Sequence, residues 1–259
     1  MRQAILIEYD ERIATITLNN PDKLNALDLG MWQGMTQAFQ TLSANDDLRC
    51  IVLRGAGDKA FAAGADIEEF TRMRSSSAQA QDYAQVTHAA MEAIAGSRHP
   101  TVAMIQGACV GGGLEIASMC DMRICGESSR FGVPVNRLGL VMSYGELGGL
   151  MALAGPAVAL EIVLEGRVFG AAEALEKRLV NRVVPDAEVP AQAYAAARRI
   201  SQGAPLVARW HKQFVRRLLN PAPLSAAEHA EAYACFDTED FRIGYQAFVD
   251  KSKPAFLGR

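Results

Sequence analysis

The stretch GACVGGGLEIASMCD, residues 107–121, decides how this chain folds. Three glycines follow a strand pattern, and Leu114 and Glu115 then open an apolar helical pattern. Backbone N–H groups at the start of a helix have no intrahelical partner, and glycine lets a ligand oxygen approach them closely. The stretch therefore predicts that a carbonyl oxygen binds beside residues 111–113 and that Glu115 moves a proton next to it.

A second glycine-containing segment, FAAGAD at residues 61–66, precedes this stretch. Its small side chains allow a ligand to approach the backbone, and Asp66 can cap a helix that begins at Ile67. A tight turn into a helix is the alternative interpretation. Together with the amides of residues 111–113, the N–H groups of this segment can form a two-donor hole for an oxyanion.

Glu115 lies about one turn into its predicted helix, and its position has two interpretations. A buried carboxylate is costly there unless it is paired or functional. A partly exposed glutamate near a helix N-terminus is instead stabilised by the helix dipole. The residues alone leave both interpretations open.

Strand and helix patterns alternate along most of the chain, which is typical of an α/β fold with parallel strands. IATITL, CIVLRG, TVAMIQG and MRICG are predicted strands. Asp28 is expected to cap a helix that runs to about Ala44, and a long helix is expected over residues 78–97. Two further helices are predicted at 145–155 and 156–165.

The strands stop after residues 179–186, and helices are predicted at 189–202, 205–219, 224–236 and 239–251. We therefore expect a core at residues 1–190 that holds the site and a helical region at residues 191–259. The helical region is expected to pack on the core or on a neighbouring subunit, where it can cover the site and support oligomerisation.

Composition and charge exclude several function classes. The 259 residues carry a net charge of -3 and no run of five basic residues, which argues against a nucleic-acid partner. The five cysteines form no CxxC pair, and the four histidines share no ligand spacing with them, so reduced thiols and no metal site are expected. No signal peptide and no membrane-spanning apolar run are recognised, so a cytoplasmic location without a membrane partner is expected.

Two shorter motifs are interpreted as structural. GAGDKA at residues 55–60 matches G-x-G-x-x-A, but Asp58 and Lys59 disfavour the helix start that a dinucleotide site needs, so a turn is predicted. Ser143 lies in VMSYG, where Val141 replaces the first glycine of a nucleophile elbow, and no histidine occupies a comparable glycine-rich setting. A serine hydrolase is therefore disfavoured.

FAAGADI followed by GACVGGGLEIASMCD, RFGVP and LGL resembles the crotonase superfamily, also called the enoyl-CoA hydratase/isomerase superfamily. NPDKLNAL near the N-terminus and QAFVDK near the C-terminus also match, so the resemblance covers about residues 5–256. It implies a crotonase-like spiral of ββα turns with a C-terminal helical region, assembled as a trimer or a dimer of trimers. The implied substrate is an acyl-CoA thioester, with no cofactor beyond that coenzyme A.

The same resemblance implies roles for particular residues. The backbone N–H groups of Ala65 and Gly112 would hold the thioester oxygen, and Glu115 would act as acid or base. The residues implied to contact CoA, the last two often across a subunit boundary, are Lys23, Leu24, Ala26, Ala63, Ala65, Asp66, Ile67, Phe248 and Lys251.

One position departs from the pattern of hydratases in this family. A second glutamate usually follows the proline of FG-x-P-E, whereas this chain reads FGVPVNRLG with Val135 there. Addition of water needs an activated water and a proton for the α-carbon, which two carboxylates supply, whereas double-bond migration needs one proton carrier. Glu146 in SYGELGG is the candidate second carboxylate; the alternative is an ordinary glutamate in the first turn of a helix.

Four functions remain open at this stage. The leading one is an enoyl-CoA hydratase-like lyase that uses Glu115, with Glu146 as its candidate second carboxylate. The second is an isomerase or another enolate-forming enzyme with one acid/base group. A non-catalytic paralogue that binds acyl-CoA is the third, and an RNA-binding role is disfavoured by the lack of basic runs.

Overall fold

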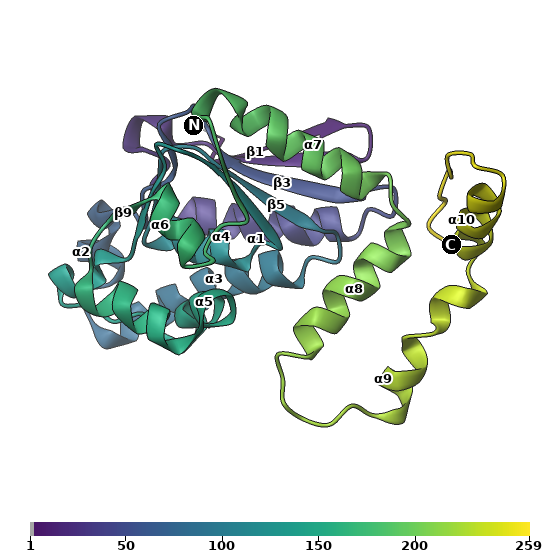
Figure 1. Ribbon diagram of the computed structural model, residues 1–259. Coiled ribbons are helices and arrows are strands. Elements are labelled where there is room, and N and C mark those ends of the chain that lie inside the picture. The colour runs from purple at the N-terminus through teal and green to yellow at the C-terminus, as the bar shows by residue number, and fades with distance from the viewer. Residues whose placement is uncertain (1–2) are drawn as a thin grey trace.

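A computed structural model describes residues 3–259 and contains a large, mostly parallel sheet (Figure 1). β1 (Ile5–Asp10) pairs antiparallel with β2 (Ile13–Leu18), and the other neighbours pair in parallel in the order β1-β2-β3-β5-β7-β10. The parallel strands are β3 (Cys50–Gly55), β5 (Thr101–Ile105), β7 (Met122–Gly126) and β10 (Arg182–Val184). The predicted α/β class is confirmed.

A second, four-stranded sheet has the order β4-β6-β8-β9. Its strands are β4 (Ala60–Ala62), β6 (Ala108–Val110), β8 (Arg130–Gly132) and β9 (Phe169–Gly170). The strands β3, β5 and β7 of the large sheet are each followed along the chain by a strand of the small sheet, which is the expected ββα spiral. The GAGDKA segment connects β3 to β4 and opens no helix, which confirms that it is a turn.

Helices cover both faces of the large sheet. α7 (Val189–Ser201) lies over one face, and α1 (Leu29–Ser43), α3 (Ser77–Gly96) and α4 (Gly112–Met119) lie over the other (Figure 1). Alternate residues of β3 divide between the two cores, since Ile51 packs on the side of α1 and Val52 on the side of α7. The helices of the larger core are α1 (Leu29–Ser43), α3 (Ser77–Gly96), α4 (Gly112–Met119), α5 (Tyr144–Glu165) and α6 (Ala171–Glu176).

The start of α1 follows directly from its sequence. The Asp28 side chain accepts a hydrogen bond of 2.8 Å from the Met31 N–H, a cap worth about 1 kcal/mol. Trp32, Met35 and Phe39 recur at helical spacing and are buried, as the apolar stripe indicates. This packing fixes α1, and with it the Trp32 ring, against the site described below.

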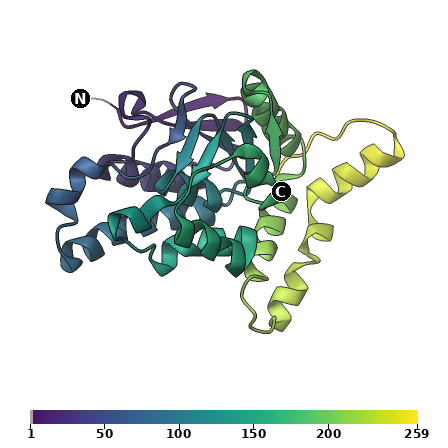
Figure 2. The same ribbon diagram turned by 60° about the vertical axis from the view of Figure 1, so that its left-hand side comes forward.

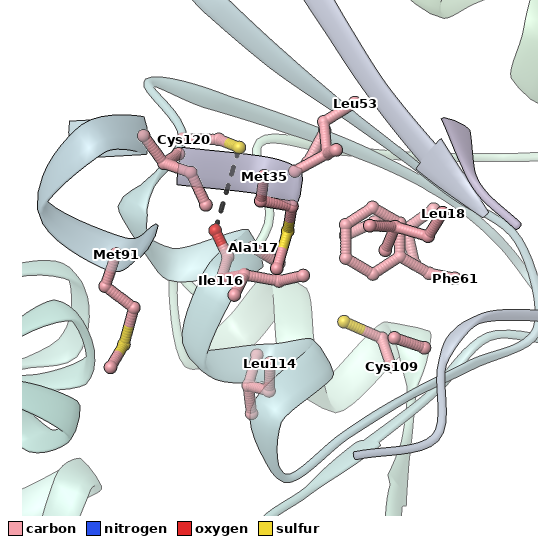
Figure 3. Packing of buried hydrophobic residues seen from close by; sticks show 14 of the residues in the cluster. Leu18, Met35, Leu53, Phe61, Met91, Cys109, Leu114, Ile116, Ala117 and Cys120 are labelled. Atoms are coloured by element: carbon pink, nitrogen blue, oxygen red, sulfur yellow. Dashed lines mark hydrogen bonds between the residues drawn. The ribbon is translucent and has the colours of Figure 1, made fainter. Parts of the chain in front are cut away.

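Buried cysteines pack among the apolar side chains of the larger core. Figure 3 shows Cys109 and Cys120 among residues that include Met35 and Phe61. Burial raises the pKa of Cys120 to about 12, so its thiol stays protonated and unreactive. All five cysteines are free, and residues 3–259 contain no cluster suited to a metal.

α5 confirms one expectation and corrects another. The helices predicted at 145–155 and 156–165 are its two halves, because Gly155 adopts the non-helical φ 75° and ψ 174° and Pro156 begins the second half. By length and composition alone, α5 is the one helix among the described residues that is long and apolar enough to cross a membrane. The expectation that no segment is long and apolar enough for this was therefore wrong. The glutamates of α5 lie toward its ends, so the stretch between them is apolar. The break at Gly155 interrupts the helix midway.

The last helices form an arm that extends away from the sheets (Figures 1 and 2). Its helices are α8 (Pro205–Arg217), α9 (Ala226–Glu231) and α10 (Glu239–Val249). The helix predicted at 224–236 is shorter, because the short 3-10 helix Ala234–Asp237 follows α9. The chain then returns to the body, where the Arg49 guanidinium donates to the carbonyl oxygens of Ser201 and Phe256. The predicted division at residue 190 stays a prediction; α7 packs on the sheet.

Candidate active site

The glycines of residues 111–113 shape the start of α4 in different ways. Gly111 precedes the helix with φ +52°, and its N–H donates to the Gly132 carbonyl at 2.8 Å. A Cβ at Gly113 would lie 2.2 Å from the carbonyl oxygen of Ala62, so only glycine lets α4 approach β4 this closely. The helix N-terminus is thereby pressed against the FAAGAD segment.

Two unpaired backbone donors meet at this contact. A Cβ at Gly64 would lie 3.8 Å from the Gly112 nitrogen, so the two loops touch. The Leu27 N–H donates to the Gly64 carbonyl, and the Asp66 N–H donates to the Leu27 carbonyl. Neither hydrogen bond uses the N–H of Ala65, which lies between them in the chain. Within residues 3–259, neither the Ala65 N–H nor the Gly112 N–H donates a hydrogen bond. The structure therefore brings together the two predicted oxyanion-hole donors.

Both donors line a cavity of about 140 Å³ between α1, α3, α4 and the start of α5. Its wall is mostly apolar, and both Glu115 and Glu146 line it. The other lining residues are Trp32, Ala63, Gly64, Ala65, Ile67, Phe70, Arg74, Tyr83, Thr87, Val110, Gly111, Gly112, Pro134, Val135, Leu138, Leu140, Val141 and Met142. No C-terminal helix of the same chain contributes to this wall.

Glu115 is buried, with 7% of its surface exposed, so the interpretation as a partly exposed helix residue was wrong. Within the described residues its carboxylate has no ion pair or hydrogen bond. Burial first, and then the charge of Glu146, raise the pKa of Glu115 to about 8, while Arg74 opposes that rise. A carboxylic acid that keeps its proton at neutral pH can donate it to a bound ligand.

The position of Glu146 is compatible with both of its interpretations, and its role as second carboxylate stays a prediction. It lies in the first turn of α5, where its carboxylate accepts from the Ser143 N–H in a capping box. It also lines the cavity and is close enough to Glu115 to raise that residue's pKa. Val135 lines the same cavity, so the usual second carboxylate is absent from its place and another carboxylate enters from α5.

The residues expected along the CoA path form two adjacent segments. The Ala63 N–H donates to the Leu24 carbonyl at 3.0 Å, which holds residues 23–26 beside residues 63–67. The Lys23 ammonium lies 2.8 Å from Asp66 and 2.7 Å from Glu68, at the surface. Ala26 lies in the first segment beside Leu24, and Ile67 is exposed at the mouth of the cavity.

Phe248 and Lys251 lie apart from the other predicted site residues. Both belong to the arm, at the end of α10 and just after it, and Phe248 is 86% exposed. Neither lines the cavity in this chain. A role for them at the CoA nucleotide would therefore involve a neighbouring subunit.

Several cavity residues were not identified from the sequence. Arg74 directly follows α2 (Phe70–Met73), and Tyr83 belongs to α3. Both lie outside the FAAGAD and glycine-rich segments. Their ring–cation contact depends on how these helices pack, so no local pattern reveals it. His88 Nε2 lies 2.8 Å from Ser143 Oγ, which the sequence also did not indicate, but neither residue lines the cavity.

Comparisons with known proteins agree with this geometry. The family model described as Enoyl-CoA hydratase/isomerase matches residues 8–259. A probable enoyl-CoA hydratase of Mycobacterium bovis is 36% identical over 99% of both chains. The short-chain-enoyl-CoA hydratase of Clostridium acetobutylicum is 31% identical over 96% of this chain and 95% of its own length.

Solved structures show the same likeness. The crystal structure of an enoyl-CoA hydratase/carnithine racemase from Magnetospirillum magneticum has a TM-score of 0.98 and 49% identity, covering 100% of this chain and 97% of that one. The enoyl-CoA hydratase of Bacillus anthracis has a TM-score of 0.93 and 30% identity, with 99% and 100% coverage. These matches confirm the predicted crotonase-like fold.

Proposed function

Because the chain belongs to the enoyl-CoA hydratase/isomerase family, we propose that it adds water across the double bond of a 2-enoyl-CoA thioester. The observation that carries this proposal is the pair of free N–H groups, Ala65 and Gly112, in one cavity with Glu115 and Glu146. Donors of this kind stabilise the oxyanion that forms when a nucleophile adds next to a thioester.

The two carboxylates supply the remaining chemistry. Glu146 takes a proton from water while the water oxygen bonds to the β-carbon. The electron pair of the double bond moves to the thioester oxygen, and the enolate is held by the two N–H groups. Glu115, whose pKa of about 8 keeps it mostly protonated at neutral pH, returns a proton to the α-carbon.

The second candidate is isomerisation of a 3-enoyl-CoA. The observation that favours it is Val135, an apolar residue that lines the cavity where hydratases of the family place a carboxylate. In that reaction Glu115 would remove a proton from the α-carbon and return it to the γ-carbon. Glu146 would then serve only as a capping residue of α5.

The proposal extends to binding and assembly. Residues 23–26 and 63–67 contact the coenzyme A portion, which is part of the substrate, and no further cofactor takes part. The arm forms a trimer or a dimer of trimers and covers the site, as its exposed rings Phe241, Tyr245 and Phe248 support. Phe248 and Lys251 then contact CoA bound to a neighbouring subunit. A cytoplasmic enzyme is consistent with this acyl-CoA chemistry.

Hydration of crotonyl-CoA tests the proposed function. The purified protein is incubated with crotonyl-CoA in water enriched in heavy oxygen, and loss of the conjugated thioester absorbance is followed. We expect 3-hydroxybutyryl-CoA that carries the oxygen label, identified by its mass. Absence of labelled product, with conversion of 3-hexenoyl-CoA to 2-hexenoyl-CoA, would replace the hydratase by the isomerase. Binding of CoA thioesters without either reaction would indicate a non-catalytic paralogue.

Replacing Gly112 by proline tests the oxyanion hole. Gly112 is the first residue of α4, a position that tolerates proline, and proline removes the N–H. We expect kcat/KM for crotonyl-CoA to fall by about 10²–10³-fold relative to Gly112→Ala. The alanine variant is the matched control, because either substitution places a Cβ about 3.3 Å from Trp32 and Leu27. Equal activity of the two variants would show that the Gly112 N–H does not stabilise the enolate.

A further inference from the structure

Arg74 is a cation in the wall of the cavity that the proposed reaction does not use. It follows α2, and among the described residues that line the cavity it is the only cation. Within residues 3–259 its guanidinium makes no ion pair and no hydrogen bond to a carboxylate. A cation placed beside a buried carboxylic acid, but paired with neither glutamate of the site, has donors available to a ligand.

Two aromatic rings orient this guanidinium. Its central carbon lies 4.5 Å from the centre of the Phe70 ring and 5.1 Å from the centre of the Tyr83 ring. Arg74, Phe70 and Tyr83 all line the same cavity. The aromatic rings contact the flat face of the guanidinium, and the N–H groups at its edge can still bind a planar anion through two hydrogen bonds. The rings therefore hold Arg74 in an orientation that suits a carboxylate.

The Trp32 indole is a second donor in the same wall. Its Nε1 is buried and makes no hydrogen bond of good geometry among the described residues. An indole N–H donates and cannot accept. Burial raises the pKa of Tyr83 to about 12 and a hydrogen bond from Trp32 opposes that rise, so the Tyr83 hydroxyl is the acceptor beside this N–H.

The charges in the cavity leave room for an anion. Glu115 is mostly protonated below about pH 8. Among the described residues Arg74 makes no ion pair with either glutamate of the cavity. An anionic group that reaches Arg74 gains a bidentate ion pair in an apolar wall, where such hydrogen bonds are strong.

We propose that Arg74 binds a second carboxylate at the far end of the acyl group, so that the preferred substrates are monothioesters of short unsaturated dicarboxylic acids with CoA. This inference rests on the proposed function, because it takes the thioester oxygen to lie at the Ala65 and Gly112 N–H groups.

The test compares each acid with an apolar substrate of the same shape. The acids are the 1-CoA thioesters of trans-2-pentenedioic and trans-2-hexenedioic acid. Their matched partners, in which two methyl groups replace the carboxylate oxygens, are 5-methyl-2-hexenoyl-CoA and 6-methyl-2-heptenoyl-CoA. We expect kcat/KM for at least one acid to exceed that of its partner by about 10- to 100-fold, the range for hydrogen bonds to a charged group.

Arg74→Met is expected to abolish this preference. Arg74→Lys is expected to retain only part of it, because lysine keeps the positive charge but cannot form the bidentate hydrogen bonds of a guanidinium. Arg72→Met is the matched control, since Arg72 belongs to α2, is exposed and does not line the cavity. The preference is a ratio measured in one protein, so a general loss of activity in a variant cancels. Circular dichroism verifies that each variant is folded.

The outcomes separate this inference from the proposed function. Hydration of crotonyl-CoA without any preference for the acids, or a preference that survives in Arg74→Met, would overturn the inference alone. If no 2-enoyl-CoA is hydrated, calorimetry with glutaryl-CoA and its isostere 5-methylhexanoyl-CoA decides. Tighter binding of glutaryl-CoA that Arg74→Met removes would then support the carboxylate site while the hydratase proposal fails, and equal binding would overturn both.

Discussion

Glu115→Gln is expected to lower kcat/KM for crotonyl-CoA hydration by about 10²–10⁴-fold, the range for loss of a positioned acid or base. The glutamine has nearly the same shape and fills the same buried position, but it cannot donate a proton to the α-carbon. Steady-state kinetics with the conjugated thioester absorbance measure this change. Glu176→Gln, at an exposed position at the end of α6, is the matched control and should leave the rate unchanged.

The pH dependence of the same reaction gives a second measurement of Glu115. Hydration in the proposed direction requires the protonated acid, whose fraction declines as the pH rises through about 8. We therefore expect kcat/KM of the wild type to fall above about pH 8 and the residual activity of Glu115→Gln to lack this decline. A decline that persists in the variant would assign the titration to another group and remove Glu115 from the role of acid.

Local patterns were sufficient for the elements that position the site. The three glycines, the strand before them and Glu115 are neighbours in sequence, so the strand, the helix start and the position of Glu115 in its first turn could be predicted together. Asp28 and Asp66 also cap helices as expected, because a cap depends on only a few adjacent residues. The short strands of the small sheet were mostly missed, because three residues such as Ala60–Ala62 carry no clear periodicity.

Long-range packing determined the rest of the site. Arg74 and Tyr83 meet because α3 packs beside α1 and returns toward α2, which no local pattern encodes. Glu115 was left between two interpretations for the same reason, since its burial depends on α5 and the loop before it covering α4. The roles of Phe248 and Lys251 stay predictions, because a neighbouring subunit would have to supply the contact.

Glu146→Gln is expected to lower crotonyl-CoA hydration by about 10²–10⁴-fold, because water then loses the base that activates it. Glutamine suits this test, since its carbonyl oxygen can still accept from the Ser143 N–H and keep the start of α5 capped. Glu146→Ala removes both the base and the cap. We therefore expect the alanine variant to match the glutamine variant in rate but to unfold at a lower temperature.

The same variant distinguishes the two candidate reactions, because migration of a double bond needs only Glu115. If Glu146→Gln hydrates crotonyl-CoA as fast as the wild type, Glu146 is only a capping residue and the two-carboxylate mechanism is wrong. If hydration is lost, adding Val135→Glu should restore part of it, since residue 135 lines the same cavity. Recovery in that double variant would show that the reaction requires a second carboxylate in the cavity and that α5 supplies it in this chain.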